Sequence, residues 1–445
     1  MIPILWSYPY KYVFKHESLL NIIISHLSDN TIKLLKDNNI ISTNFQKQKL
    51  TFNYITFFKY LNCIHRIIPR GSTLLEEEIY KLFIRECSSI KCLNMYMLNY
   101  PIYKYPGADI SLSNLYELTC DTDDQNFYHE LAQICRSIEK IHLKFYLRKS
   151  VNKISGIEEL IKMQKQIKYV YIKDYYECKR ITQALEKHAN SIIHLELETK
   201  TGYFLIPNLT NLQLLRIHRK YNYELNEIFK ENIMNAGYYK LQILELQCIS
   251  LELAINIIRN INGNLWKIKI RLANCDKAKE YNQTIYKYCP NIKYVTIFLN
   301  RDGTLEELEN ILIKCQSLKA IDIDEMILDK YRNDFLRLLI KSAPPSLYKL
   351  HINRDPIYFN KKILKLFFNS WSCKVELLDF FMDLIFGIMK LIYGVTNELT
   401  NQIGNMYEKG NGITIGDGKR AARARFQVGS RLTARFGSEV WTDSD

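Results

Sequence analysis

An aliphatic spacing that recurs along most of the chain constrains its fold more than any other feature. In segment 241–248, LQILELQC, aliphatic residues occupy positions 1, 4 and 6. Ten further segments keep this spacing, with Cys120 replacing the aliphatic residue at position 6 of one, and successive segments start 20 to 29 residues apart. Their first residues, with Leu241, are Ile90, Leu115, Ile138, Ile167, Ile192, Leu212, Leu265, Ile292, Leu318 and Leu347. This period is typical of leucine-rich repeats.

The stretches between these segments have the apolar spacing of helices. The clearest are 77–87, 127–135, 178–189, 251–261, 305–315 and 331–341. Each unit is therefore predicted to contain a strand, a turn, a helix and a return. We predict an α/β fold, a leucine-rich-repeat solenoid of the ribonuclease-inhibitor-like horseshoe type, with a curved parallel sheet, outer helices and a helical N-terminal cap.

The residues at position 4 should form a row in the core. Positions 4 and 6 of a strand point to one side and the odd positions to the other, so Leu244 and Leu246 face the helices while Ile243, Glu245 and Gln247 face away. One side of a single sheet should bury Leu195, Leu215, Leu244, Ile268, Val295 and Ile321. Eleven strands at about 4.8 Å form a face roughly 50 Å long, which is enough for a folded partner.

The cysteines follow the repeat. Of the 11 cysteines, Cys87, Cys135, Cys289 and Cys315 lie three residues before the first position of a unit, which is a packing position at a helix end. No Cys-x-x-Cys pair is present, so the sequence predicts no zinc site. The chain also opens without a signal-peptide pattern. We interpret the cysteines as buried free thiols of a cytoplasmic or nuclear protein.

The formal net charge of +14 raises the question of nucleic-acid binding. Positions 3, 5 and 7 of the strands carry similar numbers of basic and acidic residues. The basic ones are Lys140, Lys144, Lys173, Arg216, Lys267, Lys269, Arg271 and Lys349, and the acidic ones are Glu117, Asp121, Glu196, Glu198, Glu245, Asp322 and Asp324. The concave face is therefore nearly neutral overall, and no specific nucleic-acid groove is predicted there. Segment 419–436, by contrast, contains basic residues and no acidic one.

The flanks differ from the array, which we assign to residues 87–355. Segments 16–27 and 52–68 are expected to be helices of an N-terminal cap, 16–86. We expect C-terminal helices in 356–408, and a basic, disordered tail in 409–445.

The apolar run 377–395 has three interpretations: a cap over the last repeat, an interfacial membrane helix, or an extension outside the fold. Its polar residues, Asp379, Asp383 and Lys390, fall in a narrow stripe on a helical wheel. Two aspartates would each cost about 2.5–3.5 kcal/mol at the centre of a bilayer, so a transmembrane helix is not predicted.

The N-terminal sequence carries a resemblance to a known family. Segment 2–6, IPILW, is followed by an aromatic and proline-containing stretch, then by FNYITFFKYLNCIHRII at 52–68, then by the irregular repeats. This order resembles fungal F-box/leucine-rich-repeat proteins, particularly the expanded families of mycorrhizal fungi. The resemblance implies that the repeats select a substrate for a cullin-RING ubiquitin ligase, while the F-box docks the adaptor subunit. The resemblance also implies that residues 1–15 correspond to the end of an F-box-like domain, so we expect adaptor binding only where the preceding helices are restored.

No catalytic constellation is evident in the sequence. The glycine-rich segment GNGITIGDGKR, from Gly410, lacks a P-loop pattern because Ile413 stands at the first glycine position and Arg420 follows Lys419. The histidines are scattered, and no metal or cofactor site is predicted. We therefore expect no enzymatic activity.

The remaining candidate is a protein-binding surface on neighbouring strands. Tyrosines flanked by cations form hot spots in many interfaces, although exposed Tyr and Lys can also simply solvate a sheet. The candidate residues are Lys140, His142, Lys144, Tyr169, Tyr171, Lys173, Glu196 and Glu198. We predict a protein substrate or ligand on the concave sheet. Three hypotheses follow: a substrate receptor of an F-box ubiquitin ligase, a free-standing repeat scaffold unrelated to ubiquitin, and a protein whose basic tail binds nucleic acid or a membrane surface. The first is favoured and the third is the least supported.

Overall fold

The computed structural model describes most of the chain up to residue 370. The described residues are 7, 16–61, 67–69, 71–95, 100–121, 124–144, 155–174, 179–199, 209–219, 231, 233, 237–261, 263–271, 276–299, 305–323, 332–352, 362–363, 366–367 and 370. The chain divides into two units, Met1–Phe380 and Phe381–Asp445. All described residues belong to the first unit.

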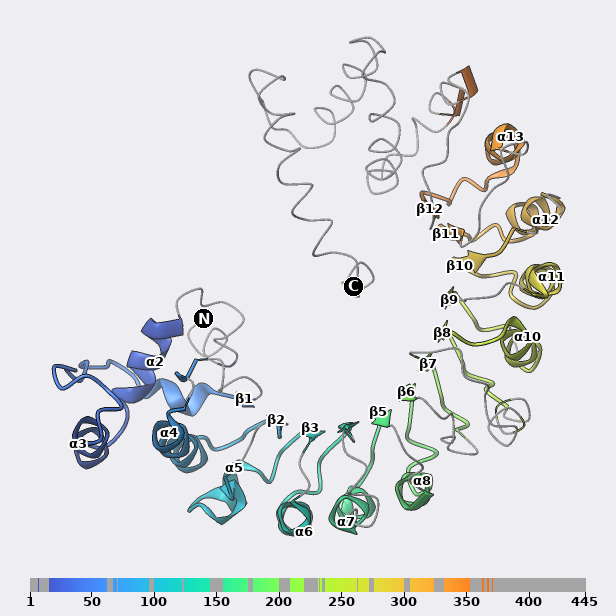
Figure 1. The fold of residues 1–445 in the computed structure, drawn as a ribbon. Coiled ribbons are helices and arrows are strands. Elements are labelled where there is room, and N and C mark those ends of the chain that lie inside the picture. Colours follow the sequence, from blue (N-terminus) through green and yellow to red (C-terminus); the bar gives the residue numbers. More distant parts are fainter. Residues whose placement is uncertain are drawn as a thin grey trace, which may run out of the picture. The chain divides into compact units, whose positions relative to one another are not determined.

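The first unit is built on a 12-stranded sheet in which the strands follow one another in chain order and each pairs with its neighbours in parallel (Figure 1). The strands are β1 (Tyr60–Leu61), β2 (Cys92–Asn94), β3 (Glu117–Cys120), β4 (Lys140–Lys144), β5 (Tyr169–Asp174), β6 (His194–Thr199), β7 (Leu214–His218), β8 (Ile243–Gln247), β9 (Lys267–Arg271), β10 (Tyr294–Ile297), β11 (Ala320–Ile323) and β12 (Lys349–Ile352). The eleven predicted strands are β2 to β12. This is the architecture of a leucine-rich-repeat solenoid, as predicted.

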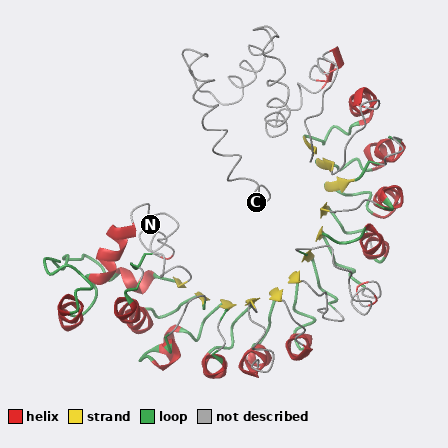
Figure 2. Cartoon of the chain, in the orientation of Figure 1, coloured by secondary structure: helices red, strands yellow, loops and turns green. Residues whose placement is uncertain are grey.

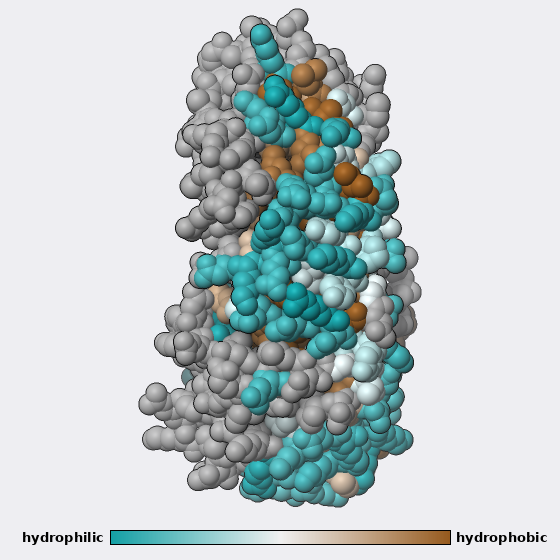
Figure 3. All heavy atoms as spheres, turned by 90° about the vertical axis from the view of Figure 1, so that its right-hand side faces the viewer, coloured by the Kyte–Doolittle hydropathy of each residue, from teal (hydrophilic) through white to brown (hydrophobic). Residues whose placement is uncertain are grey.

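The helices of the repeats lie on one side of the sheet (Figure 2). The described helical elements are α2 (His16–Ile24), α3 (Asp29–Asp37), η2 (Tyr54–Phe57), α4 (Thr73–Glu86), η4 (Ile102–Lys104), α5 (Ala108–Ser111), α6 (Gln125–Ile134), α7 (Ser155–Met163), α8 (Lys179–Glu186), α10 (Leu251–Arg259), α11 (Ala278–Tyr288), α12 (Glu306–Lys314) and α13 (Arg332–Ser342). All six stretches predicted from apolar spacing overlap observed helices. The outer side of the later repeats is mostly hydrophilic, interrupted by groups of hydrophobic residues (Figure 3).

The position-4 residues form the predicted row in the core. Leu195 pairs in register with Leu215, which pairs with Leu244, and the row continues through Ile268, Val295 and Ile321. None of the six side chains is more than 2% exposed. Each first residue of a unit, from Ile90 to Leu347, is fully buried as well. The repeated spacing therefore builds one continuous aliphatic core between the sheet and the helices.

The four repeat cysteines are the C-terminal caps of α4, α6, α11 and α12, which confirms the predicted position at helix ends. All four thiols are free and buried. Burial raises the pKa of Cys87, Cys289 and Cys315 to about 12, so these groups remain neutral thiols. Such thiols are packing residues rather than nucleophiles.

The prediction of a helix over 52–68 is wrong. The structure has the short helix η2 and then β1, whose Tyr60 and Leu61 pair with the first predicted strand, β2. Phe58 and Leu61 are each only 1% exposed. Extending the sheet by one strand gives these side chains a core position, and this tertiary burial outweighs the local helical spacing. The helix predicted over 16–27 is confirmed as α2.

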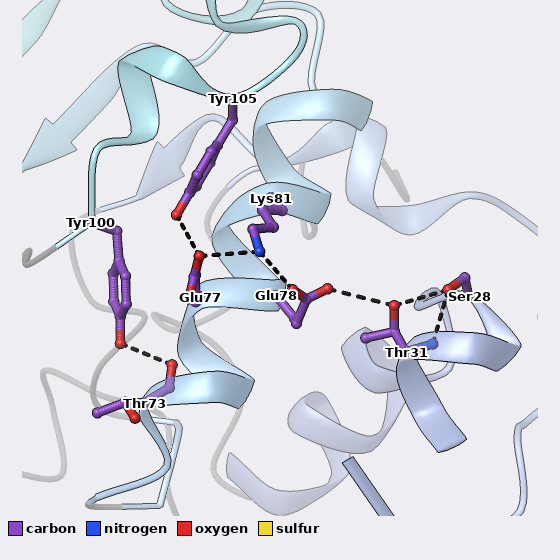
Figure 4. Close-up of polar contacts among 8 residues, drawn as sticks. All are labelled: Ser28, Thr31, Thr73, Glu77, Glu78, Lys81, Tyr100 and Tyr105. Atoms are coloured by element: carbon purple, nitrogen blue, oxygen red, sulfur yellow. Dashed lines mark hydrogen bonds and ion pairs between the residues drawn. The ribbon is translucent and has the colours of Figure 1, made fainter. Parts of the chain in front are cut away.

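Polar contacts attach α3 to the first repeat helix, α4 (Figure 4). The hydroxyl of Thr31 donates to Glu78 across 3.5 Å. Lys81 Nζ lies 2.8 Å from Glu78 and 3.0 Å from Glu77, and the hydroxyl of Tyr105 donates to Glu77 across 3.4 Å. Helix α3, helix α4 and Tyr105 therefore share one network of hydrogen bonds and ion pairs.

Several predictions fall on residues outside the described part of the chain. These are the F-box-like end at 1–15 apart from Ser7, the apolar run 377–395 and the basic tail 409–445. Among the described residues, no helix combines the length and the apolar character that a bilayer crossing requires.

Candidate protein-binding face

The side chains at positions 3, 5 and 7 lie on the sheet face opposite the helices, which we call the open face. The predicted contact residues occupy β4, β5 and β6, which are adjacent in the sheet. The register aligns them in three rows: Lys140–Tyr169–His194, His142–Tyr171–Glu196 and Lys144–Lys173–Glu198. The structure therefore brings all eight predicted residues together with His194, and we call these nine residues the contact cluster.

The aromatic side chains of the contact cluster are held by their neighbours. The ring of Tyr171 lies 5.5 Å from that of His142, centroid to centroid. Its hydroxyl donates to Glu198 across 2.8 Å, and Lys173 Nζ lies 2.6 Å from the same carboxylate. Both tyrosines are half-buried. Each tyrosine ring therefore packs against a histidine ring and keeps an exposed portion that a partner can contact.

His194 belongs to the cluster as an uncharged ring. Burial, together with the positive charge of Arg216, lowers the pKa of His194 to about 4. The imidazole is therefore neutral near pH 7. Its ring lies 5.6 Å from that of Tyr169, so the two residues form an aromatic pair at position 3.

Acidic residues in β3 and directly after it border the cluster on one side. Glu117 lies 3.2 Å from both Lys140 and His142. Burial acts to raise the pKa of Glu117, but the contacts with His142 and Lys140 outweigh it and lower the pKa. Just after β3, burial raises the pKa of Asp121 to about 6 against the opposing charge of Lys144. Electrostatic contacts thus connect β3 with β4.

A chain of ion pairs continues from β6 to β9. Arg216 lies 2.8 Å from Glu196 and 2.6 Å from Glu245, and Lys267 lies 3.0 Å from Glu245. Glu245 is only 7% exposed although it lies on the open face. Burial acts to raise its pKa, but the hydrogen bonds and charges of Arg216 and Lys267 lower the pKa to about 2. We call Glu196, Arg216, Glu245 and Lys267 the ion ladder.

An apolar strip runs beside the ion ladder. At position 3, Tyr169 and His194 are followed in register by Leu214 and Ile243. All four are half-buried. Further along, the rings of Trp266 and Tyr294 approach to 5.8 Å edge to face. The open face of these strands therefore combines an apolar strip with a row of paired charges.

The contacts of the ion ladder were not predicted from the sequence, although its charged residues were identified there. The sequence does contain a signal for these contacts, because opposite charges alternate at position 5 in three successive units. The residues are Glu196, Arg216 and Glu245. Register makes such residues cross-strand neighbours. For metal binding, the described part of the chain holds no group of three His, Cys, Asp or Glu residues arranged to bind an ion.

Comparison with known proteins adds little to this geometry. No protein-family model matches the chain. No curated protein matches it either. Among solved structures, it is similar to the leucine-rich repeat-containing protein LegL7 from Legionella pneumophila, at 13% identity and a TM-score of 0.29, over 58% of this chain and 91% of that one. A similarity of this size carries no argument about function.

Proposed function

We propose that this chain is a non-enzymatic scaffold that binds a protein partner on its open face, centred on the contact cluster of β4 to β6. The observation that carries the proposal is the alignment of Tyr169 and Tyr171 with cations and carboxylates on neighbouring strands. A leucine-rich-repeat array presents such a row of variable side chains on a rigid sheet. The function is therefore recognition, with specificity set by the odd strand positions.

The arrangement of the tyrosines favours contact over simple solvation. A tyrosine loses little conformational entropy on binding and offers a large amphipathic surface. Here the ring of Tyr171 is already held by His142 and Glu198, so less freedom remains to be lost. The paired charges fix the polar surroundings of the rings, which suits a folded protein partner with complementary charges.

Proximity labelling in cells with variants of the full chain tests this proposal. The double variant Tyr169→Ala/Tyr171→Ala should lose a defined set of labelled proteins that the parent recovers. The matched control is Tyr239→Ala/Tyr288→Ala, because these tyrosines are 55% and 41% exposed and lie outside the strands. Identical labelled sets for the parent and both variants would contradict the proposal.

A finer function is substrate selection for a cullin-RING ubiquitin ligase. It is supported by the resemblance of IPILW and the irregular repeats to F-box/leucine-rich-repeat proteins. Co-purification distinguishes this receptor from a free-standing scaffold. Recovery of the ligase adaptor together with open-face partners would support the receptor. Recovery of those partners without the adaptor would support the scaffold.

A further inference from the structure

Cys248 differs from the other described cysteines in its exposure. Six of the seven described thiols belong to buried residues, whereas Cys248 is half-buried and lies directly after β8. Its backbone φ is +55°, a left-handed conformation that residues other than glycine seldom adopt. The chain therefore leaves the extended conformation at this residue. Among the described cysteines, Cys248 is the one with substantial contact with solvent in the folded protein.

The residue beside Cys248 in the sheet is Arg219. His218 pairs in register with Gln247, so Arg219 and Cys248 are the next residues along β7 and β8. The backbone amide of Arg219 donates to the carbonyl of Gln247 across 3.1 Å, which continues the pairing beyond His218. Arg219 and Cys248 thus occupy the same position, position 8, of two successive units.

The guanidinium of Arg219 is buried without hydrogen-bond acceptors. The residue is only 4% exposed, and its Nε and Nη2 atoms have no hydrogen-bond partner in the described part of the chain. Burial lowers the pKa of Arg219, and the charge of a Cys248 thiolate opposes this effect. Arginine nevertheless keeps its charge in proteins, and a buried charge without a partner is unfavourable. An acceptor atom at Cys248 would therefore stabilise the folded protein.

We propose that Cys248 is a site of oxidation by hydrogen peroxide, and that Arg219 binds the oxygen atom that is added to the sulfur. The sulfur attacks one oxygen of the peroxide, so that an S–O bond forms and the O–O bond breaks. The second oxygen leaves as hydroxide and takes up the thiol proton to give water. The sulfur loses two electrons to the peroxide, and the product is a sulfenic acid.

Arg219 suits both this reaction and its product. Negative charge develops on the departing oxygen while the O–O bond breaks, and a nearby guanidinium stabilises that charge. After the reaction, the oxygen on the sulfur can accept hydrogen bonds from Nε and Nη2. The sulfur of an unmodified thiol is only a weak acceptor. Oxidation therefore supplies the acceptor that the buried guanidinium lacks. This site needs no protein partner, so it goes beyond the recognition proposed for β4 to β6.

Treatment of the full chain with peroxide in the presence of dimedone, which labels sulfenic acids, tests the proposal. Peptide mass spectrometry, which separates Cys248 from every other cysteine, should find the label there. Arg219→Met should be labelled at least about tenfold more slowly than the parent, because the charge beside the reacting oxygen is lost. Arg219→Lys keeps a positive charge and should react at an intermediate rate.

The matched control is Arg259→Met, which removes a guanidinium from the surface of α10 and should react like the parent. The buried Cys289 and Cys315 report on folding in the same experiment, because they should stay unlabelled in every folded variant. A second measurement needs no substitution of Arg219. Peroxide should raise the thermal midpoint of the parent relative to that of Cys248→Ser, because only the parent gains an acceptor for the guanidinium.

Three results would overturn the proposal. The first is the absence of label at Cys248 in the folded parent. The second is an equal rate of labelling in the parent, Arg219→Met and Arg259→Met. The third is a peroxide effect on the thermal midpoint that is the same for the parent and Cys248→Ser.

Discussion

The two faces of the sheet use neighbouring residues of the same strands in opposite ways. On β8, Leu244 faces the helices at position 4 and is fully buried among aliphatic residues that every unit repeats. Its neighbour Glu245, at position 5, is also buried, but by Arg216 and Lys267 on the adjacent strands. Burial on the helix side is thus apolar and uniform, whereas burial on the open face depends on a particular order of charges.

This difference separates folding from recognition. The aliphatic row is interchangeable from unit to unit, because each position needs only an apolar side chain of suitable size. The open face changes from aromatic on β5, through the alternating ladder, to wholly basic on β9. A partner that recognises this order would contact residues whose replacement leaves the array folded. The following predictions test that separation.

The largest effect is expected on the helix side. Leu244→Ala should lower the free energy of unfolding by about 2–5 kcal/mol, because the substitution leaves a cavity in a continuous core. Urea denaturation measures the change. The control Gln247→Ala, on the open face of the same strand, should remain within about 0.5 kcal/mol of the parent. Equal urea midpoints for Leu244→Ala and Gln247→Ala would contradict the different roles assigned to the two faces.

A smaller loss is expected from the ion ladder. Glu245→Gln keeps the shape of the side chain but leaves Arg216 and Lys267 without their shared carboxylate, and it should cost about 1–3 kcal/mol. The comparison is Glu252→Gln, because the side chain of Glu252 is 62% exposed and pairs with Lys277 at the surface. That substitution should cost no more than about 1 kcal/mol. A larger effect for Glu252 than for Glu245 would contradict the assigned role of the ladder.

The ladder also predicts a dependence of stability on pH. The pKa of Glu245 is about 2 in the folded protein, below its value of 4.5 in the unfolded chain. Its contribution is therefore complete above pH 4.5 and is lost as the pH falls toward 2. Thermal unfolding of the parent and Glu245→Gln between pH 6 and pH 2.5 should show a stability difference that shrinks with acidification. A constant difference would show that the carboxylate charge does not contribute.

The smallest change in stability is expected in the contact cluster. Tyr169→Ala/Tyr171→Ala should shift the free energy of unfolding by about 1 kcal/mol or less per residue, since both side chains lie only half-buried on the open face. Circular dichroism during urea titration gives the value. A loss as large as that of Leu244→Ala would assign these tyrosines to the core.

The helix side of the sheet was predictable from the sequence because it depends on a spacing of residues within each short segment. A fixed spacing of aliphatic residues decides which side chains enter the core, and all six position-4 residues named from sequence are buried. The same spacing failed at 52–68, where Tyr60 and Leu61 extend the sheet instead of continuing a helix. That choice depends on an available sheet edge, which no local window contains.

The open face was predictable only in part. Alternation along a strand correctly grouped Tyr169 and Tyr171 with their neighbours, because odd and even positions of a strand face opposite sides of the sheet. The contacts of Glu245 depend instead on which residues of other units lie opposite, at distances of 20 to 29 residues in sequence. Its burial by Arg216 and Lys267 appears only once the register is known. A count of charges gives only the nearly neutral total of the open face and does not show which residues pair.

Site-specific photocrosslinking tests most directly whether the open face is where the partner binds. Benzoylphenylalanine in place of Tyr171 lies in the contact cluster, whereas the same group in place of Tyr288 lies at the end of α11, in the helix layer. Irradiation in cells should join the chain to a discrete partner from position 171 and to none from position 288. Adducts from position 288 alone, or the same adducts from both positions, would contradict recognition through the open face.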